Sequence, residues 1–216
     1  MGAFAGRAVW LRRVACAALL ATAPGPAALA GPAPSEQTAR LNAALIAAMQ
    51  GGSALGFDGR YQLIDGVARE VFDFAGMARA AAGSFWATLG DGGQARLVEA
   101  FTRLSVATYA ARFDGFSGER FEVKGESPAG RGVVLVANNL IKNTGDPVAI
   151  NYYFRDGVGG WRVADVMIEA KYSELAVKRS EFTAVLKSDG LAGLLARIED
   201  RIRQFRKGGG GPGGGG

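Results

Sequence analysis

The spacing of apolar side chains changes twice along this 216-residue chain, and these changes constrain the fold more than any other feature. Up to about residue 115, large apolar residues recur every three to four positions, which is the period of amphipathic helices. Between residues 120 and 169 they alternate with polar residues or form β-branched runs, as strands do. After residue 173 the helical period returns. This order predicts an α+β domain with the helices gathered on one face of a sheet.

The predicted helices begin after short polar residues that can cap them, and two of them end at glycines. The expected caps are Ser35, Asp58, Asp73, Asp91 and Ser173. Gly83 is expected to end the third helix and Gly190 the fifth. A sixth helix then places its leucines and isoleucines on one strict stripe.

Four predicted strands follow one another with short links. The first carries Phe121 and Val123, and the others span residues 132–141, 148–154 and 161–169. Consecutive strands with short connections form an antiparallel meander. We therefore expect a curved four-stranded sheet and, because helices wrapped on one face of such a sheet commonly leave a hollow, an enclosed apolar cavity.

Large apolar residues on the inward positions are more numerous than a tight core of this size needs. A close-packed core is the alternative for any one of them, but together they favour the lining of an apolar pocket. The expected lining residues are Phe74, Met77, Leu97, Phe101, Leu104, Ala111, Val148, Ile150, Tyr152, Phe154, Val185 and Leu194.

The first 30 residues have the layout of a secretory signal peptide. Three arginines precede a short apolar run, and an A-x-A tripeptide ends at Ala30. We expect cleavage after Ala30, a mature protein that begins at Gly31, and a periplasmic location. An uncleaved anchor is the alternative, but a spanning helix needs about 20 apolar residues and this run is shorter.

Charge and cysteine content narrow the possible functions. The only cysteine, Cys16, lies in the signal region, so the mature chain has no disulfide, thiol nucleophile or cysteine-ligated metal. The net charge of +5 includes three arginines of that region, which leaves about +2 and gives little support for nucleic-acid binding.

Residues 207–216 are glycine-rich and should be a disordered tail. Residues 31–206 then form one domain, which we expect to be a monomer.

The absence of histidine removes the commonest general base and, with the absence of cysteine, the usual catalytic dyads, triads and zinc sites. We therefore expect no catalytic residue, no metal and no cofactor. The polar residues that could still carry acid/base chemistry are Asp165, Glu169, Tyr109 and Tyr152.

Asp165 is the most informative of these candidates because it lies in the middle of the last predicted strand. We interpret it as structural and expect an ion pair with Arg79 or Arg179 from a packed helix, since buried charges are usually paired. Trp161, at the start of the same strand, is expected to be structural as well. The alternative is a general base that faces a cavity.

Four segments carry a resemblance to a known family. They are VFDFAGMARAAAGSFW at residues 71–86, the F-x-x-L-x-x-x-T-Y pattern at 101–109, GWRVADV at 160–166 and YSELAVKRSEF at 172–182. In the same order they resemble the MlaC/toluene-tolerance family of periplasmic lipid-binding proteins, over about residues 33–205. The sequence of the last segment more closely resembles that of the hopanoid-associated branch called HpnM.

The resemblance implies a curved sheet whose helices enclose a pocket for lipid tails. It also implies a carrier that moves a membrane lipid, phospholipid or hopanoid, between the inner and outer membranes. Its partners would be an inner-membrane ABC-type lipid transport complex and an outer-membrane protein. The alternative is a small acid/base enzyme, of the isomerase or dehydratase type, on a similar scaffold, with Asp165 and a tyrosine as its acid/base groups.

Overall fold

The computed structural model describes residues 1–2, 31–157, 159–169 and 171–208. The predicted signal peptide lies outside the described residues except for its first two positions. The predicted glycine-rich tail lies outside them except for its own first two. Neither prediction is tested by the structure, and the fold is built from the segment that starts at Gly31.

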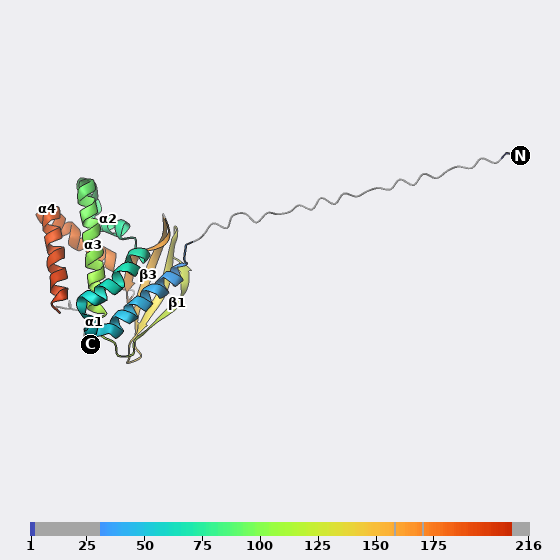
Figure 1. The fold of residues 1–216 in the computed structure, drawn as a ribbon. Helices are drawn as coiled ribbons and strands as arrows, with labels where there is room; N and C mark the ends of the chain where they lie inside the picture. The colour runs from blue at the N-terminus through green and yellow to red at the C-terminus, as the bar shows by residue number, and fades with distance from the viewer. Residues whose placement is uncertain (3–30, 158, 170, 209–216) are drawn as a thin grey trace.

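Helices make up both ends of the described chain. Three of them precede the sheet, α1 (Pro34–Val71), α2 (Phe74–Ala82) and α3 (Gly90–Arg112), and α4 (Glu174–Arg206) follows it. A short 3₁₀ turn, η1 (Gly83–Thr88), joins α2 to α3. Figure 1 shows the helices gathered on one side of the sheet, which confirms the α+β prediction.

The sheet has five antiparallel strands in sequence order, so the predicted meander is confirmed with one strand added. The strands are β1 (Arg120–Pro128), β2 (Val133–Ile141), β3 (Pro147–Gly157), β4 (Gly160–Ile168) and β5 (Tyr172–Ser173). The last strand pairs only with the end of β4. Two residues are too few to show an alternating pattern, which is why the sequence predicted four strands.

Helix α1 joins the two helices that the sequence predicted at its position. The join is a kink at Gly52 and Gly56, where φ is 40° and 59°, values that glycine adopts far more readily than other residues. The cap of α1 is Ala33 and not Ser35, because Pro34 occupies the first helical position, where its missing N–H costs nothing. Asp58 forms an ion pair with Arg206 at 2.9 Å.

Two predicted caps are confirmed by their hydrogen bonds. The Asp73 carboxylate accepts from the Gly76 amide at 2.9 Å, and the Ser173 hydroxyl accepts from the Ala176 amide at 2.9 Å. Asp91, in contrast, lies inside α3 and does not cap it. The start of α3 is instead linked to η1 by Gln94, whose side-chain amide donates a hydrogen bond to the Trp86 carbonyl.

A β-bulge in β4 decides which side chains reach the core. Phe154 pairs with Val163, but Tyr153 pairs with Asp165, so Ala164 is an extra residue in the strand. Without a bulge, residues 163 and 165 would share a face because strand side chains alternate. With it, Val163 is fully buried in the core, whereas Asp165 shares the outward face with Tyr153.

Candidate functional site

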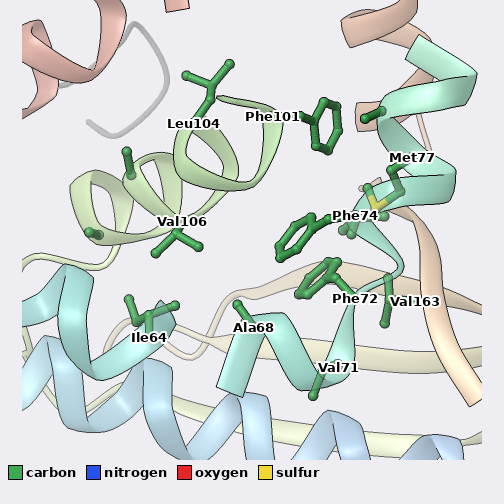
Figure 2. Close-up of a cluster of buried hydrophobic side chains, with 14 of the residues drawn as sticks. Ile64, Ala68, Val71, Phe72, Phe74, Met77, Phe101, Leu104, Val106 and Val163 are labelled. Carbon is green, nitrogen blue, oxygen red and sulfur yellow. The ribbon is translucent and has the colours of Figure 1, made fainter. Parts of the chain in front are cut away.

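The twelve residues predicted to line a lipid pocket meet in one hydrophobic cluster. Nine of them are buried, and Ala111, Val148 and Val185 pack at its edge. Figure 2 shows part of this cluster, where Phe74, Met77 and Phe101 converge from two helices. In the described structure these side chains pack in contact with one another, and their role as the lining of an enclosed pocket stays a prediction.

Aromatic rings form the centre of this cluster. The Phe72 and Phe74 rings stack with centroids 5.1 Å apart, Phe74 contacts Phe101 at 6.4 Å, and Phe101 contacts Phe182 edge-on at 5.9 Å. We call Phe72, Phe74, Phe101, Phe182, Tyr109 and Tyr152 the aromatic cluster. Sequence reasoning missed Phe72 as a site residue because it falls between two helices, outside either stripe.

Two of the six residues in the aromatic cluster carry a hydroxyl group, Tyr109 of α3 and Tyr152 of β3. Both rings contact Phe72, at 5.9 and 6.4 Å between centroids. The Tyr152 side chain is fully buried, and its hydroxyl has no hydrogen-bond partner among the described residues. The Tyr109 hydroxyl lies close enough to interact with the Tyr152 phenol.

Burial raises the pKa of both phenols. The pKa of Tyr152 lies well above its usual value of 10, because of burial first and of the facing Tyr109 second. Tyr109 is partly exposed as a residue, yet burial of its hydroxyl end is again the main cause of its raised pKa, followed by the negative charge of Glu174. Both groups are therefore neutral hydrogen-bond donors near neutral pH, and neither is suited to act as a general base.

Two surface clefts border the helices. The smaller, of about 370 Å³, lies where the end of α1, the start of α2 and β4 meet. Phe72 and Phe74 belong to its lining, and so do the basic residues Arg69 and Arg162. Since the two phenylalanines are also members of the aromatic cluster, this cleft reaches that cluster from the surface.

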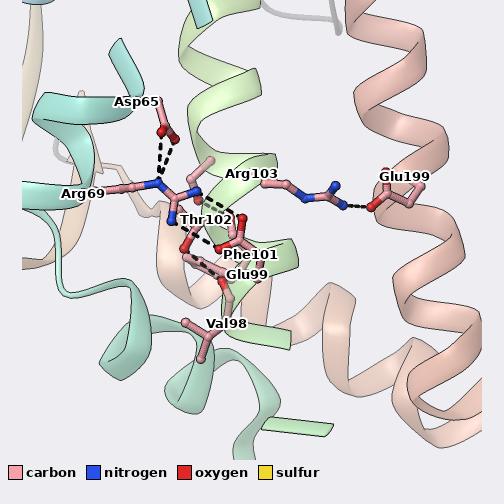
Figure 3. A network of polar contacts seen from close by, with 9 residues as sticks. Asp65, Arg69, Val98, Glu99, Phe101, Thr102, Arg103 and Glu199 are labelled. Atoms are coloured by element: carbon pink, nitrogen blue, oxygen red, sulfur yellow. Dashed lines mark hydrogen bonds and ion pairs between the residues drawn. The ribbon is translucent and has the colours of Figure 1, made fainter. Parts of the chain in front are cut away.

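The larger cleft, of about 610 Å³, runs between α3 and α4 and is lined by charged residues and alanines. Figure 3 shows the ion pair between Arg103 and Glu199 that joins the two helices there. The same network extends to Arg69, which binds Glu99 at 3.1 Å and Asp65 at 3.0 Å. These pairs fix the outer faces of the helices and leave the aromatic cluster untouched.

Comparison with known proteins identifies the family. The family model described as MlaC protein matches residues 39–200, three quarters of the chain. The chain belongs to the MlaC family. This is a family of periplasmic lipid-binding proteins without catalytic activity. A search of curated proteins gives no match.

One solved structure shows how far the MlaC fold is shared. It is a phospholipid-binding protein from Ralstonia solanacearum, determined in complex with a phospholipid. Its TM-score to this chain is 0.69 at 23% sequence identity, and the match covers 81% of this chain and 99% of that one. The fold of this MlaC-family chain is therefore the fold of a protein that has been seen to hold a phospholipid.

Asp165 has different partners in this MlaC-family chain from those that the sequence predicted. Its carboxylate accepts from the Ser173 hydroxyl at 2.6 Å, from the Val166 amide at 2.8 Å and from the Leu175 amide at 3.2 Å. In the described part of the chain neither Arg79 nor Arg179 forms an ion pair with it, so that expectation was wrong. The bulge turns Asp165 outward, and β5 brings the start of α4 beside it.

The contacts of Asp165 define its role. A carboxylate at a helix N-terminus is stabilised by the free amides and the positive end of the helix dipole. Asp165 serves α4 in this way, together with Ser173, and it lines neither of the two surface clefts described above. The alternative of a small acid/base enzyme therefore lacks the general base that it assigned to Asp165.

Two further polar contacts tie the sheet to α1 of the MlaC-family fold. The side-chain amides of Asn42 and Asn138 are buried and bind one another, with the Asn42 Nδ2 donating at 2.9 Å. Gln37 donates to the Trp161 carbonyl at 2.6 Å, while the partly buried Trp161 ring packs against the core. Sequence reasoning missed both contacts, although Asn138 is a visible polar interruption in an apolar strand.

Within the described residues, no group of three or more histidine, cysteine or acidic side chains is placed to hold a metal ion. None of the described helices combines the length and apolar character that crossing a membrane requires.

Proposed function

We propose that this MlaC-family chain is a periplasmic lipid carrier, which moves a membrane lipid between the inner and outer membranes as part of an ABC-type lipid transport system. Residues 31–206 are the lipid-binding domain in this proposal, released by cleavage after Ala30. An inner-membrane transport complex and an outer-membrane protein load and unload it.

The aromatic cluster is the observation that carries the proposal. It joins the sheet to α2, α3 and α4 through apolar contacts, and a cleft at the surface ends on two of its rings. Alkyl chains that enter between the sheet and the helices replace one set of apolar contacts with another. The fold is shared with a protein that was solved with a bound phospholipid, which supports a lipid as the occupant.

The energetics fit a carrier. Moving one CH₂ group out of water is worth about 0.8 kcal/mol, so a lipid with about thirty such groups gains roughly 24 kcal/mol against water. A membrane offers the same gain, and a carrier site therefore has only to match the bilayer. Lipid chains that enter the aromatic cluster displace contacts between its rings, and this displacement is the cost of loading.

Two classes of lipid are candidates for the cargo. A phospholipid is supported by the solved relative, and a hopanoid by the resemblance of residues 172–182 to the HpnM branch. Mass spectrometry of lipids extracted from the exported, gently purified protein separates them. A protein that carries neither lipid and takes up none from vesicles would contradict the proposal.

A bulky substitution tests whether the cluster is the lipid site. Ala111 lies at the edge of the cluster on α3, where a tryptophan can extend toward the space that the lipid would occupy. We expect Ala111→Trp to reduce bound lipid while the melting temperature changes little. Ala95→Trp, on the same helix but in the α3–α4 cleft, is the matched control and should keep its lipid.

A further inference from the structure

The buried hydroxyl of Tyr152 has no structural explanation in the described protein. Its ring is fully buried on the core face of β3, and no described group meets the hydroxyl with the geometry of a full hydrogen bond, although the Tyr109 hydroxyl lies near it. A buried polar group without a partner destabilises the folded state, and phenylalanine would fill the same space without that cost. The hydroxyl therefore points to a partner that does not belong to the described chain.

The position of Tyr152 indicates where that partner binds. The Tyr152 ring lies edge-on to Phe72, and the Tyr109 hydroxyl of α3 faces it from the helix layer. The two hydroxyls thus meet at the junction of the sheet and α3, inside an otherwise apolar cluster. Phe72, which touches both rings, is also part of the surface cleft of about 370 Å³.

We propose that the Tyr109 and Tyr152 hydroxyls together bind an acceptor oxygen of the cargo lipid, the ester carbonyl of an acyl chain. This site rests on the lipid carrier function proposed above and adds the chemical group that is recognised. A carbonyl oxygen has two lone pairs and can accept one hydrogen bond from each phenol. It is also the acceptor closest to the alkyl chains, so the chains reach the apolar cluster while the headgroup stays near the cleft.

The raised pKa values of both tyrosines agree with this assignment, since they keep the two phenols protonated as donors. As a consequence, the site should select lipids by the bond that joins their chains to the glycerol backbone, ester or ether. An ester-linked lipid satisfies the hydroxyls, whereas an ether-linked lipid with the same headgroup and chains has no carbonyl and leaves them without a good acceptor. Binding should therefore discriminate between two lipids of nearly equal apolar area.

The test is competition between two phosphatidylglycerols with identical chain lengths, one diester and one diether, mixed equally in vesicles. The exported protein is incubated with them, re-isolated, and its bound lipid measured by mass spectrometry. We expect roughly fivefold more diester than diether lipid, the worth of about one net hydrogen bond. Tyr152→Phe should bring the ratio close to one and leave the melting temperature of the lipid-free protein equal or higher.

Tyr153→Phe is the matched control, because Tyr153 neighbours Tyr152 on β3 but faces outward, with its hydroxyl 3.8 Å from the Met167 sulfur. It should keep the parental ratio, and Tyr109→Phe should lower it. Equal uptake of both lipids by the parent would overturn the site and leave the carrier function standing. A parental ratio that persists in Tyr152→Phe would also overturn it. Uptake of neither lipid would overturn the carrier function and the site together.

Discussion

The sheet meets the helices through two kinds of contact in two regions, and the difference indicates where the molecule opens. In the first region, which we call the polar anchors, directional hydrogen bonds join Asn42 to Asn138, Gln37 to Trp161, and Asp165 to the start of α4. In the second, the aromatic cluster, rings contact one another without hydrogen bonds.

The two regions differ in whether a lipid chain can replace the contacts that hold them together. A hydrogen bond between buried groups has one geometry, and breaking it leaves a polar atom unsatisfied. A ring that moves away from another ring loses only apolar contact, which an alkyl chain can restore. We therefore expect lipid to enter the aromatic cluster while the polar anchors keep the sheet attached to α1 and α4.

The largest expected effect is that of Phe101→Ala in the aromatic cluster. Phe101 contacts both Phe74 and Phe182, so its removal should cost the empty protein about 4 kcal/mol of unfolding free energy. In the lipid-loaded protein the loss should be smaller, because a lipid chain fills part of the space. Chemical denaturation of the empty and loaded forms measures both values.

Asn42→Ala is the counterpart of this substitution in the polar anchors. It leaves the buried amide of Asn138 without its partner and should cost about 2 kcal/mol. This cost should be the same with and without lipid. If Phe101→Ala also lost equal stability in both forms, the distinction between the two regions would fail.

An effect between those of Phe101→Ala and Asn42→Ala is expected for Asp165→Ala, which removes the acceptor of the Ser173 hydroxyl and the Leu175 amide. We expect a loss of about 3 kcal/mol, as for other hydrogen bonds to a charged group. That corresponds to a fall in melting temperature of roughly 6–12 °C. Asp165→Asn keeps one acceptor oxygen and should lose about half as much, and a variant that melts like the parent would refute this role of Asp165.

The smallest effect is a pH dependence that arises in the aromatic cluster. Burial raises the pKa of Tyr152 above that of an unfolded tyrosine, which is about 10. Above pH 10 the unfolded chain therefore loses a proton that the folded chain retains, and folding stability falls as pH rises. The slope should be about 1.4 kcal/mol per pH unit for this residue. Alkaline denaturation of Tyr152→Phe should show a slope smaller by that amount.

Periodicity was sufficient to predict which residues form the core. The stripe of Leu97, Phe101 and Leu104 on α3 and the alternation of Ile150, Tyr152 and Phe154 on β3 are buried as expected. Both patterns extend over several turns or residues, so one irregular position does not shift them. Ala111 is less buried than Ala107 and Ala110, because the stripe rotates slowly around a straight helix.

Features that depend on a single residue could not be predicted in this way. The bulge at Ala164 reverses the face of Asp165, and nothing in the local pattern marks it. The pairing of Asn42 with Asn138 joins positions 96 residues apart, and the chain alone gives no distance between them. The stacking of the rings in the cluster depends on side-chain packing, whereas the sequence shows only which residues take part.

The consecutive order of the five strands has a consequence for how the chain reaches its fold. Each strand pairs with its neighbour in sequence, so the sheet closes through short loops that form quickly. Helix α1, in contrast, is held by a contact 124 residues away, from Gln37 to Trp161. A chain that emerges from its N-terminus can therefore cover α1 only in steps, first with α3, then with β1 and β2, and later with β4. Until β4 is in place, the part of α1 that packs against it remains exposed to non-native contacts.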